Sequence, residues 1–147
     1  MSPKKSTSTP EEIVTRFLRA LETQDHETIA ELLAPELKYT NVSLPTIKGG
    51  KRVSQILKLA LRQGTGFQVE NHHIATSGNI VLTERTDIIN AGPLHIGFWV
   101  CGRFEVQDGK IVVWCDYFDW LASTKAVLRG VVGIALPKLR PTLSKLS

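Results

Sequence analysis

The sequence has few of the residues on which metal-dependent and nucleophilic catalysis usually depend. Its two cysteines, Cys101 and Cys115, form no metal-ligand spacing, and His72 and His73 are neighbours whose side chains would point to opposite faces of a strand. It contains no glycine-rich phosphate loop, and no serine or cysteine lies in a motif that pairs a nucleophile with histidine. We therefore expect neither a metal site nor a bound cofactor.

The chain also lacks an apolar run long enough to cross a bilayer and a recognisable signal peptide. These absences predict no integral membrane contact and a cytoplasmic location, where both thiols would stay reduced. With 147 residues, 42% of them hydrophobic and 22% charged, the composition is that of an ordinary globular protein that can bury a core without disulfides or metals.

Acidic residues are absent after Asp119, and this asymmetry explains the formal net charge of +4. Five of the 18 basic residues follow Asp119, which leaves 13 basic and 14 acidic residues in the chain up to that point. The excess of positive charge belongs to a C-terminal segment and not to a nucleic-acid-binding face. We expect no nucleic-acid partner.

The patterns divide the chain into a short leader, one domain and a tail. Residues 1–8, MSPKKSTS, are polar and basic, which is typical of a disordered leader. Residues 9–130 carry the periodic patterns and are expected to form a single domain. Residues 131–147 begin with the apolar stretch VVGIALP, which needs cover. We expect this tail to lie against the pocket mouth or a partner subunit rather than a membrane surface.

The first part of the chain has helical spacing. The segment TPEE at residues 9–12 forms a capping box with proline at the first helical position, ahead of an apolar stripe. Asp25 can cap a second helix, and residues 51–63 return to helical spacing. A short strand over residues 37–42 and a loop over residues 43–50 are expected between the second and third helices.

From Phe67 onward the hydrophobic period changes to two. Four strands are expected, at residues 67–76, 79–89, 94–106 and 110–118, and Asp119 can then cap a last helix. Helices followed by antiparallel strands predict an α+β fold, in which the N-terminal helices pack on a strongly curved, mainly antiparallel sheet. Such a sheet, closed on one side by helices, forms a cone with an internal apolar pocket.

Charged residues interrupt the most strand-like segment, VLTERTDIIN. Alternation places Arg85 and Asp87 on one face of this strand, and Tyr39 and Asn41 share a face of the first strand. Asp116 shares its face of the last strand with apolar residues, where a carboxylate is costly unless it is paired, and Arg85 is the available cation. From spacing alone, this pattern fits an exposed salt bridge as well as a catalytic group.

The turn QDG between the last two strands decides which residue lies opposite Asp116. A two-residue DG loop would place Cys101 there, and a three-residue loop with Gly109 in the left-handed conformation would place Val100 there. We favour the three-residue loop, because it puts apolar residues on the pocket face: Phe98, Val100 and Phe104 rather than Trp99, Arg103 and Glu105.

Three motifs, in this order, resemble the limonene epoxide hydrolase family: YTN at residues 39–41 followed by SLP, TERTD at residues 83–87, and GKIVVWCDYFD at residues 109–119. The similarity runs from about Pro10 to about Gly130. The family has a cone-shaped fold of the nuclear-transport-factor type, which agrees with the architecture expected from periodicity. The resemblance implies hydrolysis of an epoxide to a vicinal diol by direct attack of water.

The resemblance also implies the roles of five polar residues. Asp116 resembles the general base, and Asn41 and Tyr39 resemble the groups that hold the attacking water with it. Asp87 resembles the general acid, and Arg85 resembles the bridge between the two carboxylates. Two carboxylates in a low-dielectric site resist carrying two charges, so one of them keeps a proton near neutrality.

The pocket walls expected from the pattern are apolar and consist of Leu18, Leu21, Ile89, Phe98, Val100 and Phe118. Such walls suit a terpene, steroid or lipid-like epoxide. The sequence departs from the family at Cys115, where better-known members have arginine, and in its longer tail. Two alternatives remain open: a ketosteroid-isomerase-like or dehydratase-like proton-transfer enzyme, and a non-catalytic small-molecule-binding domain of the same fold. A homodimer is expected, since it is common for folds with an exposed sheet face.

Overall fold

A computed structural model describes residues 7–143. Helix α1 (Pro10–Thr23) begins with the expected capping box: the amide of Glu12 donates to Thr9 Oγ1 over 3.2 Å, and the amide of Thr9 donates to Glu12 Oε2 over 2.9 Å. Helix α2 (His26–Leu32) is capped by Asp25, which accepts a hydrogen bond from the amide of Thr28. Most of the expected leader, residues 1–6, lies outside the described residues.

Helix α3 (Gly50–Ala60) ends earlier than the helical spacing predicted. The side chain of Thr65 explains the difference. Its hydroxyl lies 2.9 Å from the carbonyl oxygen of Ala60, and it accepts a hydrogen bond from the amide of Arg62 over 2.9 Å. These bonds stabilise a turn in place of a last helical turn, so the prediction that the helix extends to residue 63 was wrong.

Six strands form one sheet in the order β2-β1-β6-β5-β4-β3. Their bounds are β1 (Leu33–Val42), β2 (Ile47–Lys48), β3 (Thr65–Ser77), β4 (Ile80–Ala91), β5 (Leu94–Gln107) and β6 (Lys110–Phe118). Strand β1 pairs in parallel with β6, and the other neighbours are antiparallel. The expected loop over residues 43–50 contains β2, a short edge strand whose Ile47 lies opposite Tyr39.

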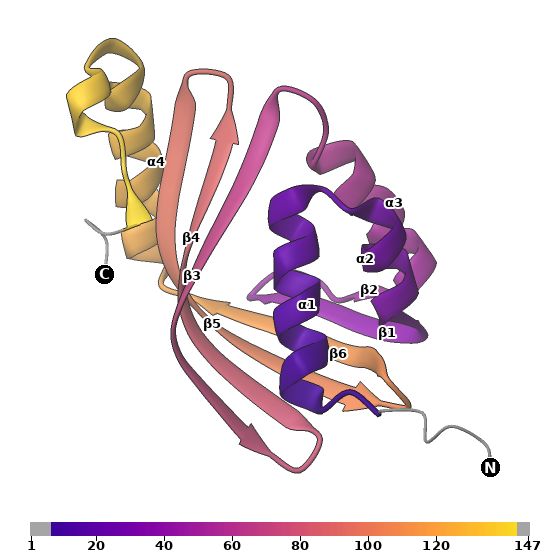
Figure 1. Cartoon of the computed structure of the whole chain (residues 1–147). Coiled ribbons are helices and arrows are strands. Elements are labelled where there is room, and N and C mark those ends of the chain that lie inside the picture. The colour runs from indigo at the N-terminus through magenta and orange to yellow at the C-terminus, as the bar shows by residue number, and fades with distance from the viewer. Residues whose placement is uncertain (1–6, 144–147) are drawn as a thin grey trace, which may run out of the picture.

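The sheet is strongly curved, and helices α1, α2 and α3 pack on one side of it (Figure 1). The core between these helices and the sheet includes Phe17 of α1, Leu37 of β1, Phe104 of β5 and Trp114 of β6. Phe17 meets Trp114 edge to face, with ring centroids 5.0 Å apart. The expected α+β architecture is therefore confirmed.

The hairpin between β5 and β6 corrects the expected register. Gln107 pairs with Lys110 across a two-residue loop, in which Asp108 and Gly109 both have positive φ. A bulge then shifts the ladder by one residue, so that Gly102 lies opposite Asp116. Neither Val100 nor Cys101 takes that position. The turn pattern could not reveal the bulge, which lies inside the strand.

Helix α4 (Trp120–Ala135) is capped by Asp119, whose Oδ1 accepts from the amides of Leu121 and Ala122. It passes the domain boundary expected at residue 130 and is followed by the 3₁₀ helix η1 (Pro137–Leu139). Figure 1 shows α4 and η1 across the curved sheet from α1, α2 and α3. None of the helices in residues 7–143 is long and apolar enough to span a membrane.

Helix α4 covers an edge of β5. The ladder between β5 and β6 begins at Val100, so residues 94–99 extend beyond the end of β6. Helix α4 packs against β5, and Gly130 comes so near to it that an added Cβ would lie 2.6 Å from the carbonyl oxygen of His95. The absent side chain at residue 130 therefore lets the helix protect a strand edge that would otherwise be open.

Candidate active site

Strand β4 carries the centre of the site. Arg85 and Asp87 alternate with outward-facing residues, and their exposed fractions are only 1% and 3%. Arg85 Nε donates to both carboxylate oxygens of Asp87, over 2.9 Å and 3.1 Å. The pair is therefore a buried ion pair and not the exposed salt bridge that spacing alone also allowed.

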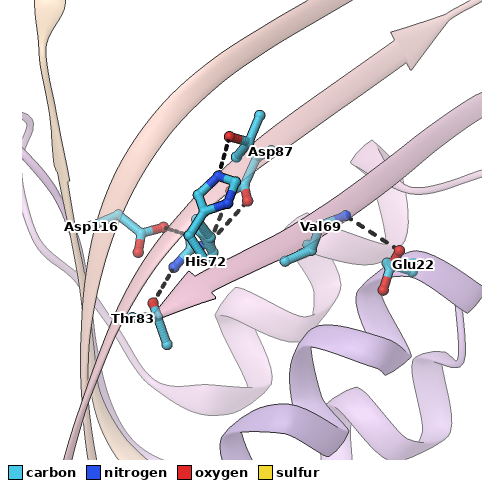
Figure 2. Close-up of polar contacts among 8 residues, drawn as sticks. Glu22, Val69, His72, Thr83, Asp87 and Asp116 are labelled. Carbon is cyan, nitrogen blue, oxygen red and sulfur yellow. Dashed lines mark hydrogen bonds and ion pairs between the residues drawn. The ribbon is translucent and has the colours of Figure 1, made fainter. Parts of the chain in front are cut away.

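The same guanidinium group reaches across the sheet to β6. Arg85 Nη2 donates to Asp116 Oδ2 over 2.9 Å, and Nη1 donates to Thr83 Oγ1 over 3.1 Å. Figure 2 labels Thr83, Asp87 and Asp116, the three residues that accept these bonds. Each of the three guanidinium nitrogens thus has an acceptor, which fixes the position of the charge between two carboxylates.

Strand β1 places Tyr39 and Asn41 beside the ion pairs. In the parallel ladder with β6, Asn41 lies next to Asp116 and Tyr39 lies next to Trp114. Asn41 Nδ2 donates to the hydroxyl oxygen of Tyr39 over 2.8 Å. This bond does not involve Asn41 Oδ1. Within residues 7–143, neither that oxygen nor Asp116 Oδ1 has a hydrogen-bond partner. Each of these two oxygens can accept a hydrogen bond from a small polar molecule.

Burial dominates the electrostatics of this cluster. It raises the pKa of Asp87 to about 6, although the charge and hydrogen bonds of Arg85 partly offset the effect. Burial also raises the pKa of Asp116, again against the opposing effect of Arg85. For Arg85, burial disfavours the charge, but the two carboxylates outweigh it and the pKa rises. Burial and the charge of Asp116 raise the pKa of Tyr39 to about 12, so its hydroxyl keeps its proton.

A cavity of about 490 Å³ lies against the cluster, and Tyr39, Asn41, Arg85, Asp87 and Asp116 all form part of its wall. This volume is within the range of small-molecule sites. Helix α4 contributes Trp120, Ser123 and Val127 to the same wall. We call these three residues the rim. One of them, Trp120, donates from Nε1 to the carbonyl oxygen of Val42, the last residue of β1, over 3.1 Å.

Four of the six apolar residues predicted for the pocket, Leu21, Ile89, Phe98 and Phe118, line this cavity. The other two do not. Leu18 packs in the core between α1 and the sheet, one turn before Leu21. Val100 lies opposite Phe118 in the ladder and is fully buried. Both residues share a face with wall residues, but neighbouring side chains separate them from the cavity.

Several wall residues were missed by sequence analysis. They are Leu57 of α3, Leu61 just after that helix, Phe67 of β3, Trp114 of β6, and the rim of α4. The apolar stripe of α3 and the shared face of Trp114 and Asp116 were visible signals for part of this set. Alternation cannot show which helix closes the cavity, so the rim had no clear signal.

Comparison with known proteins identifies the family. Residues 8–129 match the limonene-1,2-epoxide hydrolase catalytic domain, which is most of the chain. The chain belongs to the limonene-1,2-epoxide hydrolase family. It is 45% identical over 130 residues to epoxide hydrolase EphG of Mycobacterium tuberculosis (strain ATCC 25618 / H37Rv), a match that covers 88% of this chain and 87% of EphG.

One solved structure supports membership of this family, and two others share the fold alone. An M. tuberculosis epoxide hydrolase described as LEH-like superposes with a TM-score of 0.87 at 43% identity, covering 91% of this chain and 95% of that one. An NTF2-like protein of Cytophaga hutchinsonii (TM-score 0.64, 21% identity, 78% and 94% coverage) and a computationally designed 17-OHP binder (TM-score 0.70, 15% identity, 78% and 97% coverage) share the fold alone.

Within residues 7–143, no group of three or more His, Cys, Asp or Glu side chains is arranged to hold a metal ion. The polar side chains in the cavity wall include those of the aspartates, Arg85, Tyr39 and Asn41, together with Thr65, Asn90, Ser123 and the indole of Trp114.

Proposed function

We propose that this protein hydrolyses an apolar epoxide to a vicinal diol by direct attack of a water molecule. The enzyme class, epoxide hydrolase, follows from the family; the residue roles and the substrate type are our proposal. The observation that supports them best is the buried Asp87–Arg85–Asp116 network, which lies beside Asn41 and Tyr39 in the wall of an otherwise apolar cavity.

Asp116 is the general base in this proposal. A water molecule between Asp116 Oδ1 and Asn41 Oδ1 can donate a hydrogen bond to each, because both oxygens are free of other partners in the described chain. Tyr39 holds the amide of Asn41 in the required orientation. As Asp116 takes one proton from this water, the oxygen attacks a carbon of the epoxide ring and the carbon–oxygen bond breaks.

Asp87 is the general acid, and its proton goes to the oxygen released from the ring. Its pKa of about 6 means that a large fraction of the carboxyl groups is protonated in mildly acidic solution. With Asp87 protonated, Arg85 and ionised Asp116 make the buried cluster neutral overall, which is the favourable state in a low-dielectric site. Turnover leaves Asp116 protonated and Asp87 ionised, so a proton must return to Asp87 before the next cycle.

The substrate is an uncharged and mostly apolar molecule. Aromatic and aliphatic side chains make up most of the cavity wall, among them Phe67, Phe98, Phe118 and Trp120. The cation in the wall, Arg85, already forms ion pairs with two carboxylates, so it offers no uncompensated positive charge to an anionic substrate group. A terpene, steroid or other lipid-like epoxide fits this chemistry and a volume of about 490 Å³.

The arrangement favours hydrolysis over a ketosteroid-isomerase-like proton transfer. An isomerase needs one carboxylate to move a proton and donors for an enolate oxygen, and this leaves Arg85 between two carboxylates and Asn41 beside Asp116 without roles. A non-catalytic binding domain would not require a buried cluster with a raised aspartate pKa.

The test is incubation of the protein with a panel of apolar epoxides, including terpene, steroid and fatty-acid epoxides, with mass spectrometry of the products. Diol formation that disappears in Asp116→Asn is the expected result. Asp108→Asn, the same change in the exposed turn between β5 and β6, is the matched control and should keep the activity of the original chain. Binding without diol formation for every epoxide would favour the binding-domain alternative.

We also propose a homodimer, formed through the outer face of the sheet. Leu82, Trp99 and Tyr117 alternate with inward-facing residues of β4, β5 and β6 and are 50%, 44% and 44% exposed. Large apolar side chains on an open sheet face are typical of subunit contacts. Analytical ultracentrifugation of the original chain and of Trp99→Asp tests this: the variant should sediment as a monomer.

A further inference from the structure

Gly102 lies in the middle of β5, where glycine has no backbone reason to occur. It does not have the positive φ found at the turn glycines such as Gly109, so any residue could adopt its conformation. Glycine in a strand interior lowers strand stability and often marks the close approach of another group. The reason for a glycine at residue 102 must therefore lie in the space above it.

That space is filled by the ion-pair network. In the ladders, Gly102 lies between Thr83 of β4 and Asp116 of β6. A Cβ atom at residue 102 would overlap Arg85 Nη1, would lie 2.8 Å from Thr83 Oγ1 and would lie 3.0 Å from Asp116 Oδ1. The guanidinium group of Arg85 thus passes directly over the backbone of β5 on its way from β4 to β6.

We propose that Gly102 is a positioning residue for the reaction: the missing side chain opens the passage through which Arg85 reaches Asp116 while it holds Asp87. This inference rests on the proposed function and adds a residue that acts through Arg85 without touching the substrate. Thr83 completes the arrangement, because its hydroxyl accepts from Nη1, the nitrogen nearest to Gly102.

Few atoms near Arg85 can give way to a side chain at residue 102. Its exposed fraction is 1%, its Nε and Nη2 are bonded to the two aspartates, and the Phe104 ring lies 6.0 Å from its Cζ. A methyl group at residue 102 must therefore push the guanidinium away from Asp116. Among the ionisable groups on neighbouring elements, Glu22 of α1 raises the pKa of Asp87, and Asp116 raises the pKa of Tyr39 on β1, but neither group replaces this cation.

A double-mutant cycle tests the proposal. In the original chain, Gly102→Ala should lower kcat by about 100-fold with little change in KM, since a misplacement of about 1 Å in a catalytic group has this effect. The acid limb of the pH profile should move to higher pH, because a more distant Arg85 no longer lowers the pKa of Asp116. In an Arg85→Lys background, whose side chain lacks the planar fork, Gly102→Ala should cost roughly threefold or less.

Two further variants complete the experiment. Cys101→Ala, the neighbour on β5 that faces the other side of the sheet, should leave kcat and the pH profile unchanged. Thr83→Val adds no atom to the passage but removes the acceptor of Nη1, so it should lower kcat by roughly 10-fold and move the acid limb in the same direction. Thermal unfolding is measured for every variant.

The outcomes separate this inference from the proposed function. If Arg85→Lys lowers epoxide turnover but Gly102→Ala does not, the role of Gly102 is refuted and the proposed function stands. If Arg85→Lys and Asp116→Asn both keep full turnover, the proposed function itself fails. An equal cost of Gly102→Ala in both backgrounds, in turnover or in folding, would show that residue 102 acts through packing and not through Arg85.

Discussion

Arg85 connects the two carboxylates of the site, and its own burial requires an opposing charge. An arginine that is 1% exposed needs opposing charge, and Asp87 and Asp116 supply it from two strands. Burial raises the pKa of each aspartate, and the contacts with Arg85 partly offset this effect. Burial of the cluster therefore both requires the carboxylates beside Arg85 and raises their pKa values.

The two aspartates should act as a unit. Asp116→Asn removes the proposed base and Asp87→Asn the proposed acid, and each should lower kcat by about 10²–10⁴-fold. The double variant should be little slower than either single variant, because the remaining partner has no function alone. Steady-state kinetics with one apolar epoxide give all three values. Independent losses that multiply in the double variant would contradict a concerted role.

The pH dependence of kcat/KM should reveal the protonated acid. Since Asp87 must carry a proton and its pKa is raised to about 6, activity should decline as the pH rises past about 6. Asp87→Asn should remove this alkaline limb from whatever activity remains. Rates measured between pH 4 and 9 test the prediction, and a constant kcat/KM from pH 5 to 9 would exclude Asp87 as the acid.

The raised pKa of Asp87 should also lower the stability of the folded chain near neutral pH. In the unfolded chain Asp87 titrates near its ordinary value of 3.8, and in the folded chain near 6, so the folded state holds the proton more tightly. The contribution of Asp87 to the stability of the folded state is most favourable below about pH 4. It declines between about pH 4 and pH 6 and is constant at higher pH. The loss is on the order of 3 kcal/mol. Asp87→Asn should therefore lose most of its turnover, yet be at least as stable as the original chain at pH 7.5 in urea unfolding.

At the scale of single residues, sequence alternation predicted the inward faces of Arg85, Asp87 and Asp116. It could not separate a wall residue from a core residue on the same face. Leu18 and Leu21 share one stripe of α1, but only Leu21 reaches the cavity. That distinction depends on which side chains stand in front, and a periodic pattern carries no such information.

At the scale of elements, the parallel pairing of β1 with β6 assembles the site. This pairing puts Asn41 beside Asp116, although about half of the chain separates the two residues. Helix caps are local and were predicted from the sequence, as Thr9 and Asp119 show. The ladder between β1 and β6 and the bulge in the last hairpin depend on tertiary packing. The resemblance to a family, and not periodicity, placed Tyr39 and Asn41 in the site.

The cap of α1 offers a control for all the site variants. Thr9→Ala removes one half of the capping box far from the cavity and should destabilise the fold by about 1 kcal/mol. For a chain of this size, that corresponds to a decrease in Tm of roughly 2–4 °C. The value of kcat at 25 °C should not change. A large loss of activity in this variant would show that turnover responds to general destabilisation, and the losses in the site variants would then need another explanation.

At the scale of the whole molecule, the cavity lies between two groups of helices. Helices α1 and α3 supply part of one wall, and α4 supplies the rim through Trp120, Ser123 and Val127. The end of α4 is tied to η1, because Arg129 Nε donates to the carbonyl oxygen of Leu139 over 3.1 Å. The tail therefore supports the helix that borders the cavity.

Removal of the residues after Gly130 should affect large substrates most. The truncated chain loses the last turn of α4 together with η1, but it keeps all three rim residues and the polar cluster. We expect a higher KM for a steroid-sized epoxide, a smaller change for a terpene-sized one, and a nearly constant kcat. Equal changes for both substrates would indicate that the tail does not act through the rim.

The central claim is that water attacks the epoxide directly, with Asp116 as a base and not as a nucleophile. It is tested by a single turnover in heavy-oxygen water, with the enzyme in excess over an apolar epoxide and mass spectrometry of both diol and protein. Since no ester forms between the substrate and the enzyme, the first diol released should carry the heavy oxygen and the protein should carry none. An unlabelled first diol, with heavy oxygen entering Asp116 or Asp87, would contradict the mechanism.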